Sequence, residues 1–353
     1  MIYARFMPRL VAVTIAGALL PEPAPAQAPA ESAVNVRMVT DQAEAALAYA
    51  TSVRLRAPDV AAWQRLTTSD GYRRLHRREA AMGRAFTDSA FRAFLHTDTL
   101  LARVPALERT LAEWRNAAIG SAAARAFAYL PAGARLDAVI YPMVKPRDNS
   151  FVFDVGTDSA AIFLYVDPAV SGAKLENTLA HELHHIGIAA ACTDADEGAG
   201  LAAAVRPAVR WMGAFAEGIA MLAAAGGPAV DPHFTSDSTE RDRWARDYAN
   251  VAADLRRVET FFLDIVEGRL NDEPAQRQRA APFWGDAQGA WYTVGYLMAA
   301  TVERVDGRDA LIATMCDPYR LLVAYESAAR RSGDTALPRW SPRLMQHLTG
   351  NAS

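Results

Sequence analysis

Residues 177–191 read NTLAHELHHIGIAAA, and they place three of the chain's seven histidines inside an apolar, alanine-rich run. By composition alone, the pattern His-Glu-x-x-His is expected in about one sequence in a hundred of this length. Successive residues of an α-helix are about 100° apart, so His181 and His185 lie only about 40° apart on one face. Both rings can then reach a single point beyond that face. The spacing therefore predicts that these two side chains bind one metal ion.

The acidic residue inside the motif has a different place on the same helix. Glu182 lies about 100° from His181, which is too far round for a natural third ligand. It is well placed to contact a water molecule bound to the metal. Zinc suits imidazole and carboxylate ligands, and it lowers the pKa of a bound water to about 7 when one coordination position stays open. We therefore expect one Zn2+ per chain.

A third protein ligand must come from elsewhere in the chain, and Glu217 is the leading candidate. It is the only ionisable side chain in the apolar run 211–225. A buried carboxylate without a partner is costly, so this helix must either expose Glu217 or supply it with a cation. Gly218, which follows directly, would allow a neighbouring helix to approach closely.

Other side chains near the motif are competing ligands. Asp194, Asp196 and Glu197 follow it closely, but they lie in TDADEGAG, which has the composition of a solvated loop. His184 could contact a substrate or simply fill space. A metal-free interpretation also stays open, in which the histidines form a polar seam and Glu217 makes an ordinary salt bridge.

Several other kinds of site are excluded by the sequence. Ile188 and Ala191 stand where a metzincin motif continues with Gly and His. A di-iron carboxylate bundle needs a second Glu-x-x-His, which this chain lacks. The chain also contains no Gly-x-Ser-x-Gly elbow and no Walker-type phosphate loop.

The sequence around the motif predicts a mainly α protein with a small β-sheet, an α+β fold. From about residue 40 to 130, apolar residues recur at spacings of three and four, which is typical of helices. Between 136 and 167, three β-branched and aromatic segments alternate with turns, which predicts three short strands with Pro142 on an edge. Helical patterns return at 171–191 and continue towards the C-terminus, and one of them ends at Gly226–Gly227.

We expect one domain, residues 39–350, preceded by two segments that do not belong to it. Residues 1–26 have the anatomy of a signal peptide, with two arginines, an apolar run of about eleven residues and small residues with prolines. A membrane span needs about 20 residues, so we expect cleavage after Ala24-Pro25-Ala26, and a membrane anchor is the alternative. Residues 27–38 are predicted to be a poorly ordered lead-in. The domain is divided into a helical N-terminal part, a part with the sheet and the metal-binding helices, and a helical C-terminal part: 39–130, 136–226 and 227–350.

Composition limits the partners and the compartment. The formal net charge of −3 argues against a nucleic-acid partner, and 51% hydrophobic residues suffice for a proper core. We expect a secreted or periplasmic protein without stable membrane insertion. The only two cysteines, Cys192 and Cys316, permit one disulfide or remain as two buried thiols, and the sequence leaves both open.

HELHH (181–185), followed by EGIA (217–220), resembles the gluzincin metallopeptidases, whose third zinc ligand is a Glu on a later helix. More closely, the chain resembles an uncharacterised bacterial family of zinc-dependent peptidases with HExHH-type helices. That resemblance extends over most of the expected mature chain, including TTSDGYRRLHRRE upstream and WYTVGYLMAATVERVDGRDALIATM downstream. It implies a zincin-like catalytic domain with HExxH on the active-site helix.

The resemblance also implies roles for single residues. The two outer histidines of the motif and Glu217 would bind zinc, and Glu182 would be the general base that activates a water molecule. Tyr292 or Tyr296 would donate a hydrogen bond to the oxyanion, although a tyrosine among apolar neighbours is commonly a core residue. The strand AAIFLYVD (160–167) or its neighbour would border the cleft and bind an extended peptide by strand addition.

The function implied is a secreted zinc-dependent hydrolase, a peptidase that acts on peptide or protein substrates. Two alternatives stay open from the sequence. The first is a catalytically inactive zincin-like protein that binds through the same cleft, and the second is a metal-free α-helical scaffold.

Overall fold

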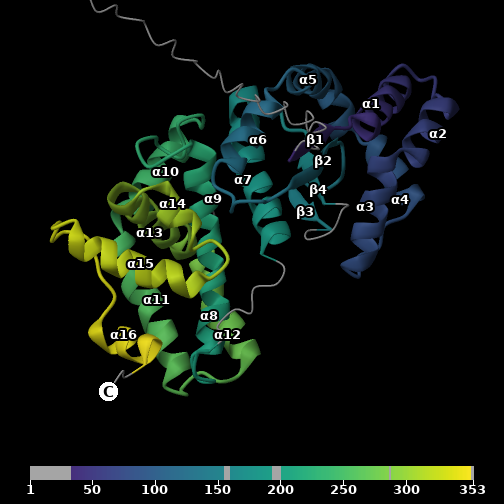
Figure 1. Ribbon diagram of the computed structural model, residues 1–353. Coiled ribbons are helices and arrows are strands. Elements are labelled where there is room, and N and C mark those ends of the chain that lie inside the picture. The colour runs from purple at the N-terminus through teal and green to yellow at the C-terminus, as the bar shows by residue number, and fades with distance from the viewer. Residues whose placement is uncertain (1–32, 155–159, 193–199, 286–287, 351–353) are drawn as a thin grey trace, which may run out of the picture. The chain divides into compact units, whose positions relative to one another are not determined.

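A small mixed β-sheet is formed by strands from the first half of the chain (Figure 1). The computed structural model describes residues 33–350 apart from 155–159, 193–199 and 286–287. Within these ranges, the strands follow the order β1-β2-β4-β3. β1, β2 and β4 run parallel, whereas β3 is antiparallel to β4. The strand bounds are β1 (Val34–Met38), β2 (Leu136–Met143), β3 (Phe151–Phe153) and β4 (Ala161–Tyr165).

A helical crossover connects β1 to β2, as parallel pairing requires. Polar side chains begin four of its helices: Asp59, Ser69, Thr87 and Thr97 each accept a hydrogen bond from a backbone N–H of the first turn. The helices are α1 (Asp41–Arg54), α2 (Val60–Thr68), α3 (Asp70–Ala81), α4 (Asp88–Leu95), α5 (Asp98–Trp114) and α6 (Ile119–Phe127).

The strand β1 corrects the prediction of a poorly ordered lead-in over residues 27–38. Residues 34–38 pair in register with 136–140 of β2. Their half-buried and exposed positions alternate along VNVRM, which is the period of a strand with one face on the core. The prediction was wrong for residues 34–38 because it rested on the Ala/Pro/Ser-rich composition of the segment, whereas the alternation in VNVRM is that of a strand. Residues 1–32, including the predicted signal peptide, lie outside the described part of the chain.

Pro142 lies in a central strand and not on the edge where the sequence placed it, because β2 runs between β1 and β4. The Ile140 carbonyl accepts a hydrogen bond from Val39 N–H at 2.8 Å, so alternate residues of β2 face β1. β1 pairs only as far as Ile140 and has ended before Pro142. The missing N–H of Pro142 therefore costs no hydrogen bond between the strands. On the same side, Val144 N–H donates to Gln42 Oε1 at 3.0 Å.

Helices make up the described chain after the sheet, which confirms the mainly α, α+β fold class. Short 3-10 turns continue α8 and α12 at 213–215 and 281–283. The helices are α7 (Gly172–Ala191), α8 (Arg206–Met212), α9 (Ala216–Ala225), α10 (Ser238–Ala249), α11 (Val251–Val266), α12 (Glu273–Ala280), α13 (Ala290–Asp306), α14 (Arg308–Ile312), α15 (Pro318–Arg331) and α16 (Pro342–Thr349).

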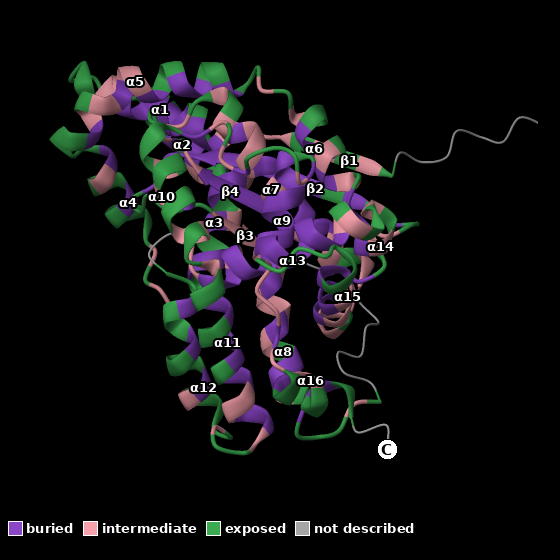
Figure 2. Cartoon of the chain, turned by 90° about the vertical axis from the view of Figure 1, so that its left-hand side faces the viewer, coloured by how far each residue is buried: buried purple, intermediate pink, exposed green. Residues whose placement is uncertain are grey.

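Two hydrophobic cores meet along α7 and α9. The first core packs the sheet against α1 to α7, and the second joins α8 to α16. Ala224 of α9 belongs to the first core, and Ile188 of α7 packs against both. Figure 2 shows buried residues concentrated on β2, β4, α7, α9 and α13. The boundary between the cores is therefore the place where side chains from both halves of the chain meet.

The segment 206–225 is apolar because it lies in the core. By length and composition this stretch could cross a membrane, but 67% of its apolar window is buried inside the protein. Gly226 ends α9 with a left-handed φ of 87°, as the Gly226–Gly227 pair predicted.

A disulfide joins Cys192, at the end of α7, to Cys316, which precedes α15. The two residues are 124 positions apart in the sequence. Of the two alternatives that the sequence left open, the disulfide is therefore confirmed. It ties the histidine-bearing helix covalently to the C-terminal helices.

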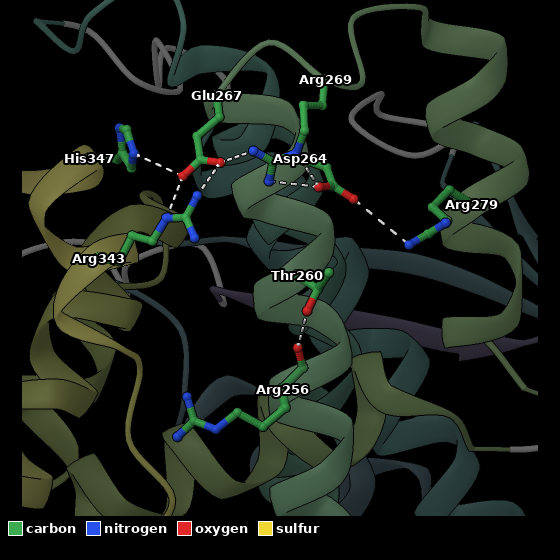
Figure 3. Close-up of polar contacts among 8 residues, drawn as sticks. All are labelled: Arg256, Thr260, Asp264, Glu267, Arg269, Arg279, Arg343 and His347. Carbon is green, nitrogen blue, oxygen red and sulfur yellow. Dashed lines mark hydrogen bonds and ion pairs between the residues drawn. The ribbon is translucent and has the colours of Figure 1, made fainter.

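Glu267, just after α11, holds the last helix in place (Figure 3). Its carboxylate accepts hydrogen bonds from Arg343 at 2.6 and 2.8 Å and lies 3.3 Å from the ring of His347, both on α16. Arg269 donates to it from the other side. Burial opposes the charge, but Arg269 and Arg343 outweigh it and hold the pKa of Glu267 below its usual range.

Candidate metal centre

His181 and His185 lie one turn apart on α7, as the motif predicted. The helix begins at Ser171, whose side chain accepts a hydrogen bond from Lys174 N–H at 3.2 Å. The two rings meet nearly edge to face, and their Nε2 atoms are 3.1 Å apart. Both side chains are half-buried. Their free nitrogen atoms thus converge on one point.

Glu217, in the first turn of α9, completes this arrangement. Its Oε2 atom lies 3.2 Å from His181 Nε2 and 3.3 Å from His185 Nε2. Within the described residues, these three side chains form the group whose ligand atoms all lie within 4.8 Å of one another. The structure therefore brings together the three residues that the sequence proposed as ligands.

A backbone contact between α9 and α13 fixes the position of Glu217. A Cβ atom on Gly218 would lie 2.0 Å from Tyr296 N and 2.5 Å from the Tyr292 carbonyl oxygen. Opposite it, a Cβ atom on Gly295 would lie 3.2 Å from the Gly218 Cα atom. The close approach predicted at Gly218 is confirmed, and the neighbouring helix is α13. Because the backbones touch, Glu217 and Tyr292 lie side by side.

The geometry of the three donor atoms fits a zinc ion. Bonds of 2.0–2.1 Å in a tetrahedral arrangement place neighbouring ligand atoms about 3.3 Å apart. The contacts among His181, His185 and Glu217 measure 3.1, 3.2 and 3.3 Å. Two imidazoles and one carboxylate also leave one position open, which is the arrangement of a catalytic zinc site.

The local electrostatics favour a carboxylate facing imidazoles. Burial would raise the pKa of Glu217, but its contacts with the imidazoles of His181 and His185 outweigh burial and hold that pKa well below the usual range. Burial likewise disfavours a charge on His185, but Glu217 and then Glu182 outweigh it and raise the pKa of His185. In the described chain, Glu217 forms no salt bridge with Lys or Arg. The carboxylate is therefore ionised and lacks a permanent cation.

Glu182 is half-buried on the same turn of α7 and stands outside the group of three ligand atoms. Its carboxylate is close enough to favour the protonated forms of His185 and Tyr292. This placement agrees with a role beside the metal site and not as a ligand.

The two candidate tyrosines differ in their surroundings. Tyr292 is half-buried, and burial, then the charge and hydrogen bond of Glu217, raise its pKa above the usual range. Its hydroxyl therefore stays protonated next to the site. Tyr296, one turn on, is 5% exposed, and its hydroxyl reaches the Val230 carbonyl at 3.5 Å. Tyr296 is a core residue with its own partner.

His184 lies on the buried face of α7, away from the ligand group. Burial lowers its pKa to about 3, with smaller effects of His185 and His181. The Tyr129 backbone lies nearby, but neither ring nitrogen of His184 makes a hydrogen bond of good geometry among the described residues. Gly187, one turn on, meets Leu130 on the same side. His184 is thus a neutral packing residue against the segment after α6.

A cavity of about 270 Å3 lies beside the ligand group, and its lining includes His181 and Tyr292. Other walls come from α10 and from the loop at 232–236. The sequence offered no motif for this wall, since its residues are ordinary polar positions of a surface helix. The competing ligands Asp194, Asp196 and Glu197 lie outside the described residues.

The expected strand addition at 160–167 is wrong, whereas for its neighbour β3, an edge strand of the sheet, the expectation stays a prediction. β4 is paired on one side with β2 and on the other with β3, so it offers no free edge. The lining of the cavity comes from helices and a loop and not from the sheet.

Comparison with known proteins identifies the family. Residues 60–334 match the model of the family described as "Putative zinc dependent peptidase (DUF5700)", and the chain belongs to this family. The match covers the whole ligand group and the walls of the cavity. No curated protein and no solved structure matches the chain.

Proposed function

We propose that this member of the family is a secreted zinc-dependent peptidase in which His181, His185 and Glu217 hold the metal. The convergence of their three ligand atoms from two helices carries the proposal. Gluzincin-type chemistry follows from the resemblance of HELHH and the later EGIA segment to that class. The family assignment supports zinc dependence in its own right.

The residues around the ligand group have the chemistry that peptide hydrolysis needs. When bound, zinc supplies Lewis-acid chemistry, since it polarises a carbonyl and lowers the pKa of a water molecule. Glu182 accepts a proton from the attacking water and delivers it to the leaving amine nitrogen. Glu182 is half-buried on the same turn of α7 as His181, which supports this role.

Tyr292 serves as the oxyanion donor in this proposal. Its hydroxyl stays protonated at physiological pH, and Tyr292 and His181 both line the cavity. A hydrogen bond directed at the developing negative charge stabilises the transition state more than the substrate. Tyr296 is left out of the mechanism because its hydroxyl faces the Val230 carbonyl.

A compartment outside the cytoplasm is part of the same proposal. The Cys192–Cys316 disulfide supports it, because disulfides persist in oxidising compartments. The signal-peptide pattern of residues 1–26 points in the same direction.

Replacement of Glu182 by Gln tests the function. We expect Glu182→Gln to bind one zinc ion per chain and to lose at least about a hundredfold in peptide cleavage, because only the proton transfers are removed. Zinc content by mass spectrometry and cleavage of a peptide library, with a chelator control, measure the two properties. Equal activity in the variant would reject Glu182 as the base. A zinc-loaded wild type that cleaves no peptide would instead support a catalytically inactive binding protein.

The two tyrosines give a matched pair for the oxyanion donor. Loss of one such donor slows enzymes by about 100-fold to 1,000-fold in kcat. We expect Tyr292→Phe to lower kcat to this extent with zinc content unchanged, whereas Tyr296→Phe keeps the wild-type rate. Equal rates in both variants would remove Tyr292 from the mechanism.

A further inference from the structure

The cavity beside the ligand group extends along one face of α7. Its lining includes Lys174, Asn177, Thr178 and His181, which recur at the spacing of a helix face. Seven residues separate the first from the last, or about 10 Å along the axis. An extended peptide covers that length with about three residues. If the peptide bond to be cleaved lies at the metal site, the cavity therefore has room for a neighbouring residue of the substrate.

The polar atoms of this cavity include one buried acceptor that has no partner. Asn177 Nδ2 donates to the Pro232 carbonyl at 3.1 Å, whereas its Oδ1 is buried without a hydrogen bond among the described residues. Such an acceptor is costly unless a bound group donates to it. A backbone N–H of a peptide that lies along α7 is a donor of the right kind.

The charges of the cavity do not balance. Lys174 and Glu240 form an ion pair of 2.5 Å and cancel each other. His233 adds no charge at neutral pH, since burial lowers its pKa. Arg243, one turn after Glu240 on α10, is half-buried in the lining, and it makes no ion pair within the described part of the chain. One positive charge therefore remains in a cavity that also contains His181 of the ligand group.

We propose that this cavity receives a substrate residue that carries a carboxylate, and that Arg243 binds it. The inference rests on the proposed peptidase function and names its substrate class. A guanidinium binds a carboxylate through two parallel hydrogen bonds, which gives strength and fixes orientation. The carboxylate is an acidic side chain or the free C-terminal end of the peptide, since both present the same group.

Peptide binding to the Glu182→Gln background tests the assignment without cleavage. The probes are three peptides of one sequence: one with a Glu residue and a C-terminal amide, one with Gln in its place, and one with Gln and a free C-terminal acid. Calorimetry with zinc-loaded protein gives the three dissociation constants. We expect one of the two carboxylate peptides to bind at least about tenfold more tightly than the peptide with neither group. The tighter one tells side-chain recognition from C-terminal recognition.

Arg243→Gln, added to the same background, should abolish this preference. Arg246→Gln is the matched control, because Arg246 lies on the same helix outside this cavity and should leave the preference intact. Equal binding of all three peptides, or a preference that survives Arg243→Gln, would overturn the assignment. Failure of the proposed function is seen separately, as absence of cleavage by zinc-loaded wild type.

Discussion

Glu217 and Glu267 both lie close to side-chain nitrogen atoms of a neighbouring helix, but the groups that carry these nitrogen atoms differ in kind. Arg269 and Arg343 bring permanent positive charges to Glu267 (Figure 3). Glu217 faces two imidazoles, and within the described residues it has no Lys or Arg in ion-pair contact. The first cluster holds helices together through charges that the chain itself supplies. The second cluster offers nitrogen lone pairs and a negative charge that a bound cation would satisfy.

The two clusters differ in the number of N–H groups that can donate to the carboxylate. A neutral imidazole has one N–H, so two Nε2 atoms 3.1 Å apart cannot both donate to Glu217 without facing each other's hydrogen. One divalent ion satisfies all three ligand atoms at once. Around Glu267, the guanidinium groups of Arg269 and Arg343 carry their own protons and positive charges, so no further ion is needed. Side chains of similar appearance thus make a structural ion pair in one place and a candidate metal site in the other.

The largest expected effect separates the two clusters by their zinc content. His185→Ala and Glu217→Ala should each weaken zinc binding at least about a hundredfold, because each removes a direct ligand. Glu267→Ala should retain one zinc per chain. Titration of metal-free protein with zinc measures the affinity, and the melting temperature should rise with zinc only where the ligands are intact. Full affinity in Glu217→Ala would move the third ligand to Asp194, Asp196 or Glu197.

A smaller effect is expected when Glu217 is displaced through its neighbour. Gly218→Ala forces a Cβ atom to within 2.0 Å of the α13 backbone, so the helices must separate. We expect the free energy of unfolding to fall by about 3 kcal/mol, with weaker zinc binding. Gly213→Ala is the control, since its Cβ atom would meet nothing within 4 Å and its φ of −53° is helical. Urea denaturation compares the variants, and equal stability would contradict the contact between α9 and α13.

The smallest effect concerns the stability that Glu267 provides. Its pKa is lower in the folded protein than in the unfolded chain, so its ion pairs stabilise the fold above the unfolded pKa of about 4.3. That stability is lost as the pH falls through the folded-state pKa. Glu267→Gln should therefore melt slightly below wild type at pH 7, and the difference should vanish in acid. Glu273→Gln, in an exposed pair with Arg277, should match wild type throughout.

Local patterns carried most of what the sequence revealed about the site. The spacing of His181 and His185 fixes their common helix face, and periodicity alone is enough for that conclusion. Glu217 was found because an isolated charge in an apolar helix needs a partner. Gly218 and Gly226 were interpreted from the conformational freedom and small size of glycine. Each of these inferences needs only a few neighbouring residues.

Features that depend on distant pairing were missed. The strand at 34–38 becomes a strand by pairing with residues about a hundred positions later, and five residues at the end of a Pro-rich segment gave only a weak signal. Pro142 is tolerated in a central strand because β1 ends below it, which no local pattern records. The wall that contains Arg243 reaches the site through the packing of α10 near α7. The sequence left the pairing of Cys192 with Cys316 open for the same reason, since it depends on the folded chain.

The disulfide also determines what happens to the ligand group when the backbone is cut once. It closes a loop of the chain that contains Glu217 and Tyr292, while His181 and His185 lie just outside it. A single cut anywhere between Cys192 and Cys316 would leave two fragments that remain covalently joined. The four residues would then stay on one molecule, held by the packing of α7 against α9. A chain cut once in this segment would therefore keep its ligand group on one covalently joined molecule.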